Sequence, residues 1–422
     1  MSKLPQHLLP DTATLTDDGS LMVGGVTVTD LAHEFGTPLF VYDEAHLRSR
    51  CRQAVAAFGD GVAYATKAFL CRAMAELAYE EGMCLDVATG GELHVALSAG
   101  VPGDRLVLHG NNKSSGELAA AIDAGVGRIV VDSFDELDRI DAIVAAGRPA
   151  PSVLVRVNPG VDAHTHEYLT TGVADSKFGF GLGSGDARRA VERIAAGSSM
   201  DLIGLHAHIG SQVFAVDSFE RAVTTLAPFV TSLDLPELSV GGGLGVAYVE
   251  GESAPSIAEW GSVVIEACRT AGIRSRVTAE PGRAIVAGAA ITVYTVGTIK
   301  QIDGVRTYVS VDGGMSDNPR PVLYGSGYEA FLPRAVAADR DIQVRVVGKH
   351  CESGDVIVSD AAVPADIEVG DLLATPVTGA YGFSMGSNYN LVPRPAVVFV
   401  ADGDARLVVR RETLDDLLRR DA

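Results

Sequence analysis

Positive charge is scarce in this chain. It has 34 Lys and Arg residues against 54 Asp and Glu residues, which gives a formal net charge of −20. Such a surface repels nucleic acid backbones and anionic lipids, so we expect neither nucleic acid nor a membrane as a partner. The charge does not exclude an anionic small molecule, because a local cluster of arginines can bind one inside a negative protein.

The chain also lacks the features of membrane and secreted proteins. Its five cysteines, Cys51, Cys71, Cys84, Cys268 and Cys351, form neither a CxxC pair nor a dense framework, which is typical of reduced thiols. No run of about 18 apolar residues could span a bilayer. The N-terminal MSKLPQHLLPDTATLTDDG is polar and has no signal-peptide core. We therefore expect a cytoplasmic protein.

A strand and helix pattern recurs along the chain. Short apolar runs alternate with stretches of helical spacing such as Ala73–Glu81 and Gly116–Ala124, which indicates a parallel sheet. Eight such units predict a (β/α)8 barrel, whose active site lies at the carboxyl ends of its strands. The runs are VAYAT (62–66), CLDVA (84–88), RLVLHG (105–110), RIVVD (128–132), SVLVRVN (152–158), LIGLHAHIG (202–210), LSVGGG (238–243) and RVTAEPGR (276–283). The candidate site residues at their ends are Lys67, Asp86, His109, Asn111, Arg156, His208, Gly241, Gly242, Gly243, Glu280 and Arg283.

The length of 422 residues, 47% of them hydrophobic, predicts more than one domain. We expect the barrel to span residues 42–290, with a long Gly- and Thr-rich excursion at 158–201 that is typical of a functional lid. Residues 291–422 are rich in Val, Ile and Tyr with frequent turns, and predict a C-terminal β-sandwich or β-barrel domain. Residues 1–41 hold short strands that cannot form a core alone, so we expect them to join that domain.

Only six of the 34 basic residues are lysines, and one of them, Lys67, follows the first predicted barrel strand. Since the chain otherwise prefers arginine, a lysine here suggests that an amine is needed. A desolvated lysine amine forms Schiff bases with aldehydes. By position alone an ordinary rim lysine is the better interpretation, but the neighbouring clusters reverse that balance.

Two glycine-rich turns follow the last two predicted strands. GGGLG (241–245) and EPGR (280–283) lie where barrels commonly bind phosphate, and glycines let backbone N–H groups approach it. A lone glycine triplet is weak support, because tight turns often use glycine, but two adjacent turns favour a phosphate site. Glu280 would lie in the barrel mouth, where a buried carboxylate needs a cationic or protonated partner. A pyridinium nitrogen would supply one.

His206 and His208 stand two apart on one face of a predicted strand. This spacing first suggests a metal site, but no third ligand has an obvious place, so we expect no metal. A flat imidazole at the strand end can instead stack on an aromatic cofactor, a role that suits His208. His206 fits better as a buried core histidine.

Three loops of the predicted second domain carry residue types that suit a site. CESGD (351–355) places a cysteine among acids and turn formers, although most cysteines are buried and inert. MSDNPRPVLYG (315–325) places Arg320 and Tyr324 on a proline-rich loop suited to an anion, although such loops are common on surfaces. GAYGFSMGSNYN (379–390) combines Gly, Ser and Asn with aromatics.

These clusters belong to a longer series of motifs. In order, the motifs are YATKA (64–68), HGNNK (109–113), VNPGVDAHTHEYLTTG (157–172), SKFGF (176–180), HAHIGSQ (206–212), GGGLG (241–245), AEPGR (279–283), SVDGGMSDNPRP (310–321), GKHCESGD (348–355) and GAYGFSMGSNYN (379–390). The series resembles the fold-type III pyridoxal-phosphate decarboxylases and, within them, the diaminopimelate decarboxylases. Each motif is modest alone, whereas all of them in order are highly specific. The departures are small, such as KAF where KAN is commoner after the lysine.

The resemblance implies pyridoxal 5′-phosphate as the cofactor and a barrel like that of alanine racemase. Lys67 would bind the cofactor as a Schiff base, His208 would stack on its ring, and Glu280 would keep its pyridine nitrogen protonated. The cofactor-binding residues would be Lys67, Asp86, Arg156, His208, Ser211, Gly242, Gly243, Glu280, Gly282, Arg283 and Tyr381.

The resemblance also implies a carboxy-lyase that converts meso-2,6-diaminopimelate to L-lysine and CO₂, the last step of lysine biosynthesis. Cys351 would donate the proton to the product carbon and, with Glu352, would enter from the second subunit of a homodimer with shared active sites. The catalytic residues would be Lys67, Cys351, Glu280 and His208. The residues that bind the substrate would be Arg283, Arg320, Tyr324, Glu352 and Tyr381.

Three other interpretations remain. A related decarboxylase of ornithine, arginine or carboxynorspermidine shares the fold, but Arg320, Tyr324 and Glu352 argue against it. An alanine-type racemase would use a tyrosine base where this chain has CESGD. A non-enzymatic homologue would typically have lost Lys67 or Cys351, and this chain keeps both.

Overall fold

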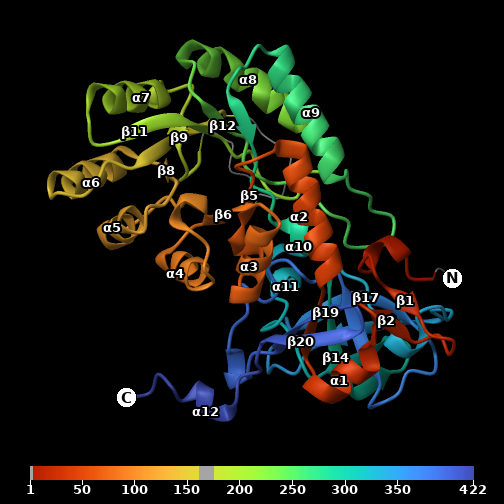
Figure 1. The fold of residues 1–422 in the computed structure, drawn as a ribbon. Helices are drawn as coiled ribbons and strands as arrows, with labels where there is room; N and C mark the ends of the chain where they lie inside the picture. The colour runs from red at the N-terminus through yellow and green to blue at the C-terminus, as the bar shows by residue number, and fades with distance from the viewer. Residues whose placement is uncertain (1–2, 161–174) are drawn as a thin grey trace. The chain divides into compact units, whose positions relative to one another are not determined.

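The computed structural model describes residues 3–160 and 175–422, which divide into two compact units (Figure 1). The barrel unit comprises Arg50–Gly245 and Ala254–Ala284. The sheet unit comprises Met1–Ser49, Val246–Ser253 and Ile285–Ala422. Most of the motif at 157–172, and with it part of the expected lid, lies outside the described residues.

Eight parallel strands form the barrel unit, and each of the eight predicted apolar runs supplies one. They follow the order β13-β12-β11-β9-β8-β7-β6-β5. Backbone hydrogen bonds from Ala63 N to Ala279 O (2.9 Å) and from Ala65 N to Pro281 O (3.2 Å) join the first strand to the segment after the last. The predicted barrel is therefore confirmed. The strands are β5 (Ala63–Ala65), β6 (Cys84–Val87), β7 (Leu106–Leu108), β8 (Arg128–Val131), β9 (Ser152–Asn158), β11 (Asp201–His206), β12 (Glu237–Ser239) and β13 (Arg276–Thr278), with the short β10 (Phe180–Gly181) beside β9.

Helices alternate with these strands and surround them in Figure 1. Several begin at a polar cap: the side chains of Thr89, Ser114, Ser133 and Ser256 each accept a hydrogen bond from the backbone N–H three residues on. These caps mark where each helix begins after the loop that follows a strand. The helices are α2 (Glu44–Phe58), α3 (Arg72–Glu80), α4 (Gly90–Ser98), α5 (Ser115–Asp123), α6 (Phe134–Ala145), α7 (Asp186–Ala196), α8 (Asp217–Leu233), α9 (Ile257–Thr270) and α10 (Arg283–Val286), with 3₁₀ turns η2 (Thr66–Ala68) and η3 (Gly103–Arg105).

A layer of small and branched side chains packs across the barrel strands. Ala63, Cys84, Val107, Val130 and Leu154 come one each from β5, β6, β7, β8 and β9, and none is more than 2% exposed. This is how barrels of this size fill their interior. The layer leaves the carboxyl ends of the strands as the place for polar side chains.

The sheet unit is built on an eight-stranded mixed sheet in the order β17-β16-β15-β14-β4-β19-β20, with β18 beside β14. The N-terminal β4 (Leu39–Asp43) lies inside this sheet, antiparallel to β14 and parallel to β19. The strands before it, β1 (Thr14–Leu15), β2 (Leu21–Val23) and β3 (Val26–Thr27), form a three-stranded sheet of their own. The other strands are β14 (Ala290–Ile302), β15 (Arg306–Val311), β16 (Ile342–Val347), β17 (Val356–Val363), β18 (Leu372–Pro376), β19 (Ala396–Ala401) and β20 (Asp404–Val409). The helical segments are η1 (Gln6–Leu8), α1 (Val28–Phe35), α11 (Arg320–Tyr324), η5 (Pro333–Ala335), η6 (Tyr389–Leu391) and α12 (Leu414–Leu417).

Two expectations drawn from composition can be compared with the structure. All five cysteines are free thiols, and among them Cys351 is exposed. Over residues 3–160 and 175–422, the structure contains no helix with the length and apolar character that crossing a bilayer requires.

A buried ion pair joins neighbouring elements at the carboxyl ends of the barrel strands. Lys113 Nζ lies 2.7 Å from Glu136 Oε1 and donates hydrogen bonds to Gly110 O (2.6 Å) and Val130 O (2.7 Å). Glu136 Oε2 accepts a hydrogen bond from Asp132 N (2.9 Å). Burial raises the pKa of Glu136, and Lys113 opposes that rise. One ammonium thus ties the ends of β7 and β8 to the first turn of α6.

We expect Lys113→Met to lower the free energy of unfolding by about 3–5 kcal/mol, because it leaves the buried Glu136 carboxylate without its cation. Chemical denaturation followed by circular dichroism measures the loss. In the double variant Lys113→Met/Glu136→Gln the buried charge is gone and an oxygen still accepts from Asp132 N–H, so this variant should lose less stability than the single one. Equal losses would mean that the ion pair is not the source of the effect.

Candidate active site

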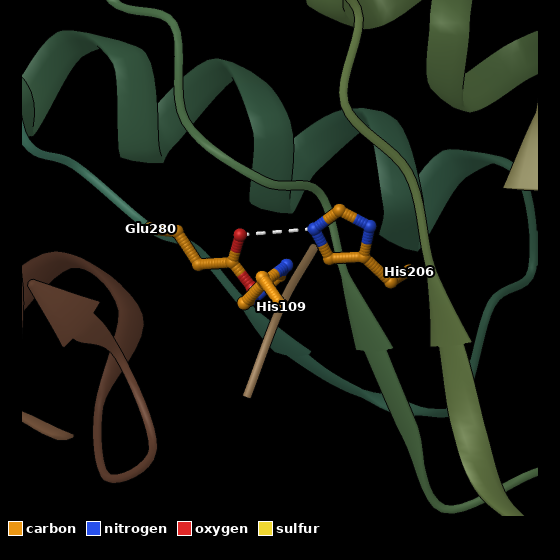
Figure 2. Close-up of side chains that lie close together, drawn as sticks. All are labelled: His109, His206 and Glu280. Atoms are coloured by element: carbon orange, nitrogen blue, oxygen red, sulfur yellow. Dashed lines mark hydrogen bonds and ion pairs between the residues drawn. The ribbon is translucent and has the colours of Figure 1, made fainter. Parts of the chain in front are cut away.

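The carboxylate of Glu280 is the meeting point of several strand ends in the barrel unit (Figure 2). Its Oε2 lies 2.9 Å from His206 Nε2 at the end of β11, and its Oε1 accepts a hydrogen bond from Ser239 Oγ (2.9 Å) at the end of β12. His109 Nε2, just after β7, lies 3.2 Å from Oε1. The two imidazole rings meet edge to face, with centroids 4.9 Å apart. These contacts fix the carboxylate in one orientation.

Neighbouring charges set the protonation of this group. Burial alone raises the pKa of Glu280, but His109 and His206 outweigh it and hold that pKa well below its usual range. Burial lowers the pKa of His206 to about 4, so His206 is neutral near pH 7. Burial also lowers the pKa of His109, but the charges of Asp86 and Glu280 raise it overall. The site therefore presents an ionised carboxylate to any cationic ring nitrogen placed beside it.

Lys67 and Asp86 lie at the ends of the first two barrel strands. Ala65 is the register partner of Asp86 in the β5–β6 pair, and Thr66 Oγ1 donates a hydrogen bond to Asp86 O (2.8 Å). Lys67 itself is exposed, between buried neighbours. Burial raises the pKa of Asp86 to about 6, and its Oδ1 lies 3.7 Å from His109 Nε2. The structure thus brings Asp86 to the Glu280 cluster through His109.

His208 is held by the glycine turn after β12. Gly242 N donates a hydrogen bond to His208 Nδ1 (3.1 Å), which fixes the plane of the ring. Burial, assisted by the charges of Lys67 and Arg156, holds the pKa of His208 well below its ordinary value. A neutral, oriented imidazole suits contact with the face of an aromatic ring.

The glycine turns leave no room for side chains. A Cβ on Gly242 would clash with the backbone oxygen of Glu280, and a Cβ on Gly243 (φ +110°) would clash with that of Gly210. Beside these turns Arg283 Nη2 donates a hydrogen bond to Ser211 Oγ (3.0 Å). A Cβ on Gly282 would meet Ala65 and Ala68, which lie on either side of Lys67 in the sequence. A guanidinium and a hydroxyl beside a turn stripped of side chains form a donor set that fits a phosphate group.

Arg156 supports the same edge from the end of β9. Its Nη1 lies 3.7 Å from Asp132 Oδ2, and its guanidinium carbon lies 4.4 Å from the centroid of the Phe178 ring. Asp132, which follows β8, also accepts a hydrogen bond from Gly179 N. This bond connects the segment that begins at residue 175 to the end of β8. Arg156 is 8% exposed.

His109, His206 and Glu280 have the spacing of metal ligands, because their ligand atoms all lie within 4.8 Å of one another. The sequence pointed to the wrong pair, since His206 joins His109 rather than His208. His109 and Glu280, which lie far from His206 in the sequence, are its partners, and local spacing could not show them. The Nε2 atoms of both histidines face the carboxylate, but only His206 is hydrogen-bonded to it, whereas His109 Nε2 lies 3.2 Å from Glu280 Oε1 without a hydrogen bond.

The sheet unit holds a buried arginine between tyrosines. Arg320, 4% exposed, donates a hydrogen bond to Tyr328 Oη, and its guanidinium carbon lies 4.2 Å from the ring centroid of Tyr248. Burial lowers the pKa of Arg320, but Tyr248 and Tyr328 outweigh burial and raise it. Among the residues that the structure describes, no carboxylate pairs with Arg320. Tyr324, at the other end of α11, is partly exposed.

Sequence reasoning missed several of these residues. Tyr248 and Tyr328 lie in no motif, and the only signal for them is contact with Arg320. Ser239 lies inside the run LSVGGG (238–243), and the sequence gives no sign of its bond to Glu280. The remaining predicted residues of the sheet unit are Cys351 and Glu352, both exposed, and Tyr381, which is partly exposed and has a positive φ of 63°.

Comparisons with known proteins show the family of this chain. The family model for the pyridoxal binding domain of pyridoxal-dependent decarboxylases matches residues 44–287. The chain is 49% identical over 437 residues to a diaminopimelate decarboxylase of Mycobacterium tuberculosis and 44% identical over 429 residues to one of Bacillus subtilis, covering 98% of each chain in both cases. The crystal structure of diaminopimelate decarboxylase from M. jannaschii in complex with L-lysine has a TM-score of 0.90 at 30% identity, again covering 98% of each chain.

The likeness extends over nearly the full length of these relatives and includes the fold of both units. The predicted family and cofactor are therefore confirmed, and the cofactor is pyridoxal 5′-phosphate. The chain belongs to the diaminopimelate decarboxylases, a family of pyridoxal-dependent carboxy-lyases.

Proposed function

We propose that the chain decarboxylates meso-diaminopimelate to L-lysine and CO₂, the last step of lysine biosynthesis. The observation that carries the choice of substrate is Arg320, a buried guanidinium that has tyrosines but no carboxylate around it in the described chain. A buried cation without an anion is costly, and a ligand carboxylate would compensate it. Diaminopimelate keeps a carboxylate at its distal end, whereas ornithine and arginine have none there.

The barrel unit supports the cofactor part of the proposal. Lys67 would hold pyridoxal phosphate covalently, and the neutral ring of His208 would lie against its face. The donors of Ser211 and Arg283, with the glycine turns, would hold the phosphate. Asp86 and Arg156 would support Lys67 and the cofactor from neighbouring strand ends, and Tyr381 of the sheet unit would add a phosphate contact.

Different residues of the chain would then carry different steps of the reaction. Bound pyridoxal phosphate would supply an electron-withdrawing ring able to take up the charge left at Cα when CO₂ departs. Glu280, ionised and fixed by His206 and Ser239, would keep the proton on the pyridine nitrogen. Cys351 would donate a proton to Cα, and the Lys67 amine would release the product. Arg283, Arg320, Tyr324, Glu352 and Tyr381 would bind the distal head of the substrate.

We further propose a cytoplasmic homodimer in which Cys351 and Glu352 of one copy complete the site of the other. Both residues are exposed, as a contribution to a second copy requires. All five cysteines are free thiols, which suits a reducing compartment.

Purified protein with added pyridoxal phosphate should release CO₂ and L-lysine from meso-diaminopimelate and leave L-lysine, L-ornithine and L-arginine unchanged. Lys67→Ala should abolish turnover, because the proposal gives the covalent role to this amine alone. Trapped CO₂ and chromatography of the amino acids measure both outcomes. Lys300→Ala, which removes an exposed lysine on β14, is the matched control and should behave like the wild type.

Other results would redirect the assignment. Turnover of ornithine or arginine would place the chain among the sister decarboxylases and remove the argument from Arg320. No turnover of any substrate, with a borohydride-reducible cofactor adduct on Lys67, would keep the cofactor site and favour the racemase or the non-enzymatic interpretation.

The Arg320 clamp makes a second prediction. Arg320→Leu should lower kcat/KM for meso-diaminopimelate by a factor equivalent to about 2–5 kcal/mol, because a buried carboxylate loses its cation. Arg320→Lys should lose less, because it keeps the charge but not the planar fork. D-lysine, which is meso-diaminopimelate without the distal carboxylate, is the matched substrate. If the preference for diaminopimelate over D-lysine were the same in Arg320→Leu and wild type, another residue would bind that carboxylate.

A further inference from the structure

Three motifs that lie far apart in the sequence meet around the loop that carries Cys351. The turn at 313–316 comes from SVDGGMSDNPRP, the loop at 348–355 from GKHCESGD, and the turn at 386–390 from GAYGFSMGSNYN. Lys349 N donates a hydrogen bond to Gly313 O (2.9 Å), and Ser387 N donates one to Ser316 O (3.0 Å). All three segments belong to the sheet unit.

The carboxylate of Asp355 joins the first two segments. Its Oδ1 accepts a hydrogen bond from Met315 N (2.6 Å), and its Oδ2 accepts one from His350 N (2.9 Å). The side chain of His350 in turn accepts a hydrogen bond from Ser316 N (3.3 Å) through Nε2. Asp355 is 3% exposed, whereas residues 351–354 at the tip of the loop are exposed. The loop therefore has a buried base held by directional hydrogen bonds and an exposed tip.

Glycines on both sides make this base compact. A Cβ on Gly314 would lie 2.7 Å from both carboxylate oxygens of Asp355, and a Cβ on Gly348 would clash with the same group. Only residues without side chains let the two backbones approach the carboxylate this closely. Glycine at both positions therefore allows the Asp355 carboxylate to reach its two backbone donors.

The tip has an anchor of its own. Cys351 N donates a hydrogen bond to Asn390 Oδ1 (3.0 Å), so the anchor is on the backbone of the cysteine itself. Asn390 has a φ of 51°, a conformation that asparagine tolerates better than most residues. The anchor thus uses a residue type suited both to the turn and to the bond.

We propose that Asp355 and Asn390 are positioning residues that fix the orientation of the Cys351 thiol. Asp355 holds the base of the loop, and Asn390 holds the backbone at Cys351 itself. The inference rests on the proposed function, in which Cys351 donates the proton that completes the reaction. Neither residue needs to touch the substrate or the cofactor.

Asp355→Asn is the sharpest change at the base. Both carboxylate oxygens accept from backbone N–H groups, so in either orientation the amide NH₂ would face a donor at Met315 or His350. At the tip, Asn390→Gly keeps the positive φ and removes the acceptor, while Asn390→Asp keeps an oxygen. Asp360→Asn, at an exposed carboxylate on β17, is the matched control.

The experiment measures kcat and KM for meso-diaminopimelate on the cofactor-loaded enzymes, together with amide hydrogen exchange of the peptide containing residues 348–355. Asp355→Asn and Asn390→Gly should lower kcat by about 10- to 100-fold with KM unchanged, since misplacing a reacting group by about 1 Å costs this much. Both should also lose exchange protection in that peptide. Asn390→Asp and Asp360→Asn should stay within about twofold of wild type, a difference too small to reflect a lost contact.

Each other result is equally informative. Lost protection with an unchanged kcat would overturn the proposal, and so would a reduced kcat with intact protection. A parallel rise in KM or loss of bound cofactor would show a general structural role instead. If the wild type does not decarboxylate meso-diaminopimelate, the proposed function fails. In that case hydrogen exchange still tests whether Asp355 anchors the loop at 348–355. Unchanged protection in Asp355→Asn would refute that anchoring.

Discussion

The carboxylate of Glu280 orders the mouth of the barrel because it accepts or meets polar groups from the ends of three other strands. His206, Ser239 and His109 reach it at 2.9, 2.9 and 3.2 Å. A buried carboxylate is costly unless its oxygens are paired, so these contacts and the burial of the group depend on one another. Through His109 the same carboxylate is linked to Asp86, and the β5–β6 register places Lys67 near by. The contacts of Glu280 thus link side chains from three strand ends at the mouth of the barrel.

Two buried cations, Lys113 and Arg320, differ in the partners that the chain gives them. Lys113 has an acidic partner and two carbonyl acceptors, so all three of its donors are used by the protein. Arg320 has a tyrosine hydroxyl and aromatic faces, and no acid pairs with it among the described residues. Aromatic contact stabilises a guanidinium without using up its planar donors. The first cation holds strands together, and the second is the one for which we propose a ligand carboxylate.

The sequence predicted the barrel well because parallel strands buried on both faces appear as continuous apolar runs, and every one of the eight runs formed a strand. The residues at the ends of those strands could also be named. Their grouping could not, since His206 and Glu280 lie 74 positions apart and local spacing paired His206 with His208 instead. The contacts of Tyr248 and Tyr328 with Arg320 could not be predicted for the same reason. The separate sheet of β1–β3 was missed because short strands carry no signal of their partners.

The place of β4 in the sheet has a consequence for synthesis of the chain. Residues 39–43 are all buried, and their two neighbours in the sheet, β14 and β19, come from residues 290–302 and 396–401. The last segment of the barrel unit ends at Ala284, so every barrel strand leaves the ribosome before either neighbour of β4 does. The nascent chain therefore carries an apolar strand with both edges open for most of its elongation. Open strand edges invite pairing with other chains, so mispairing at β4 competes with folding until translation is nearly complete.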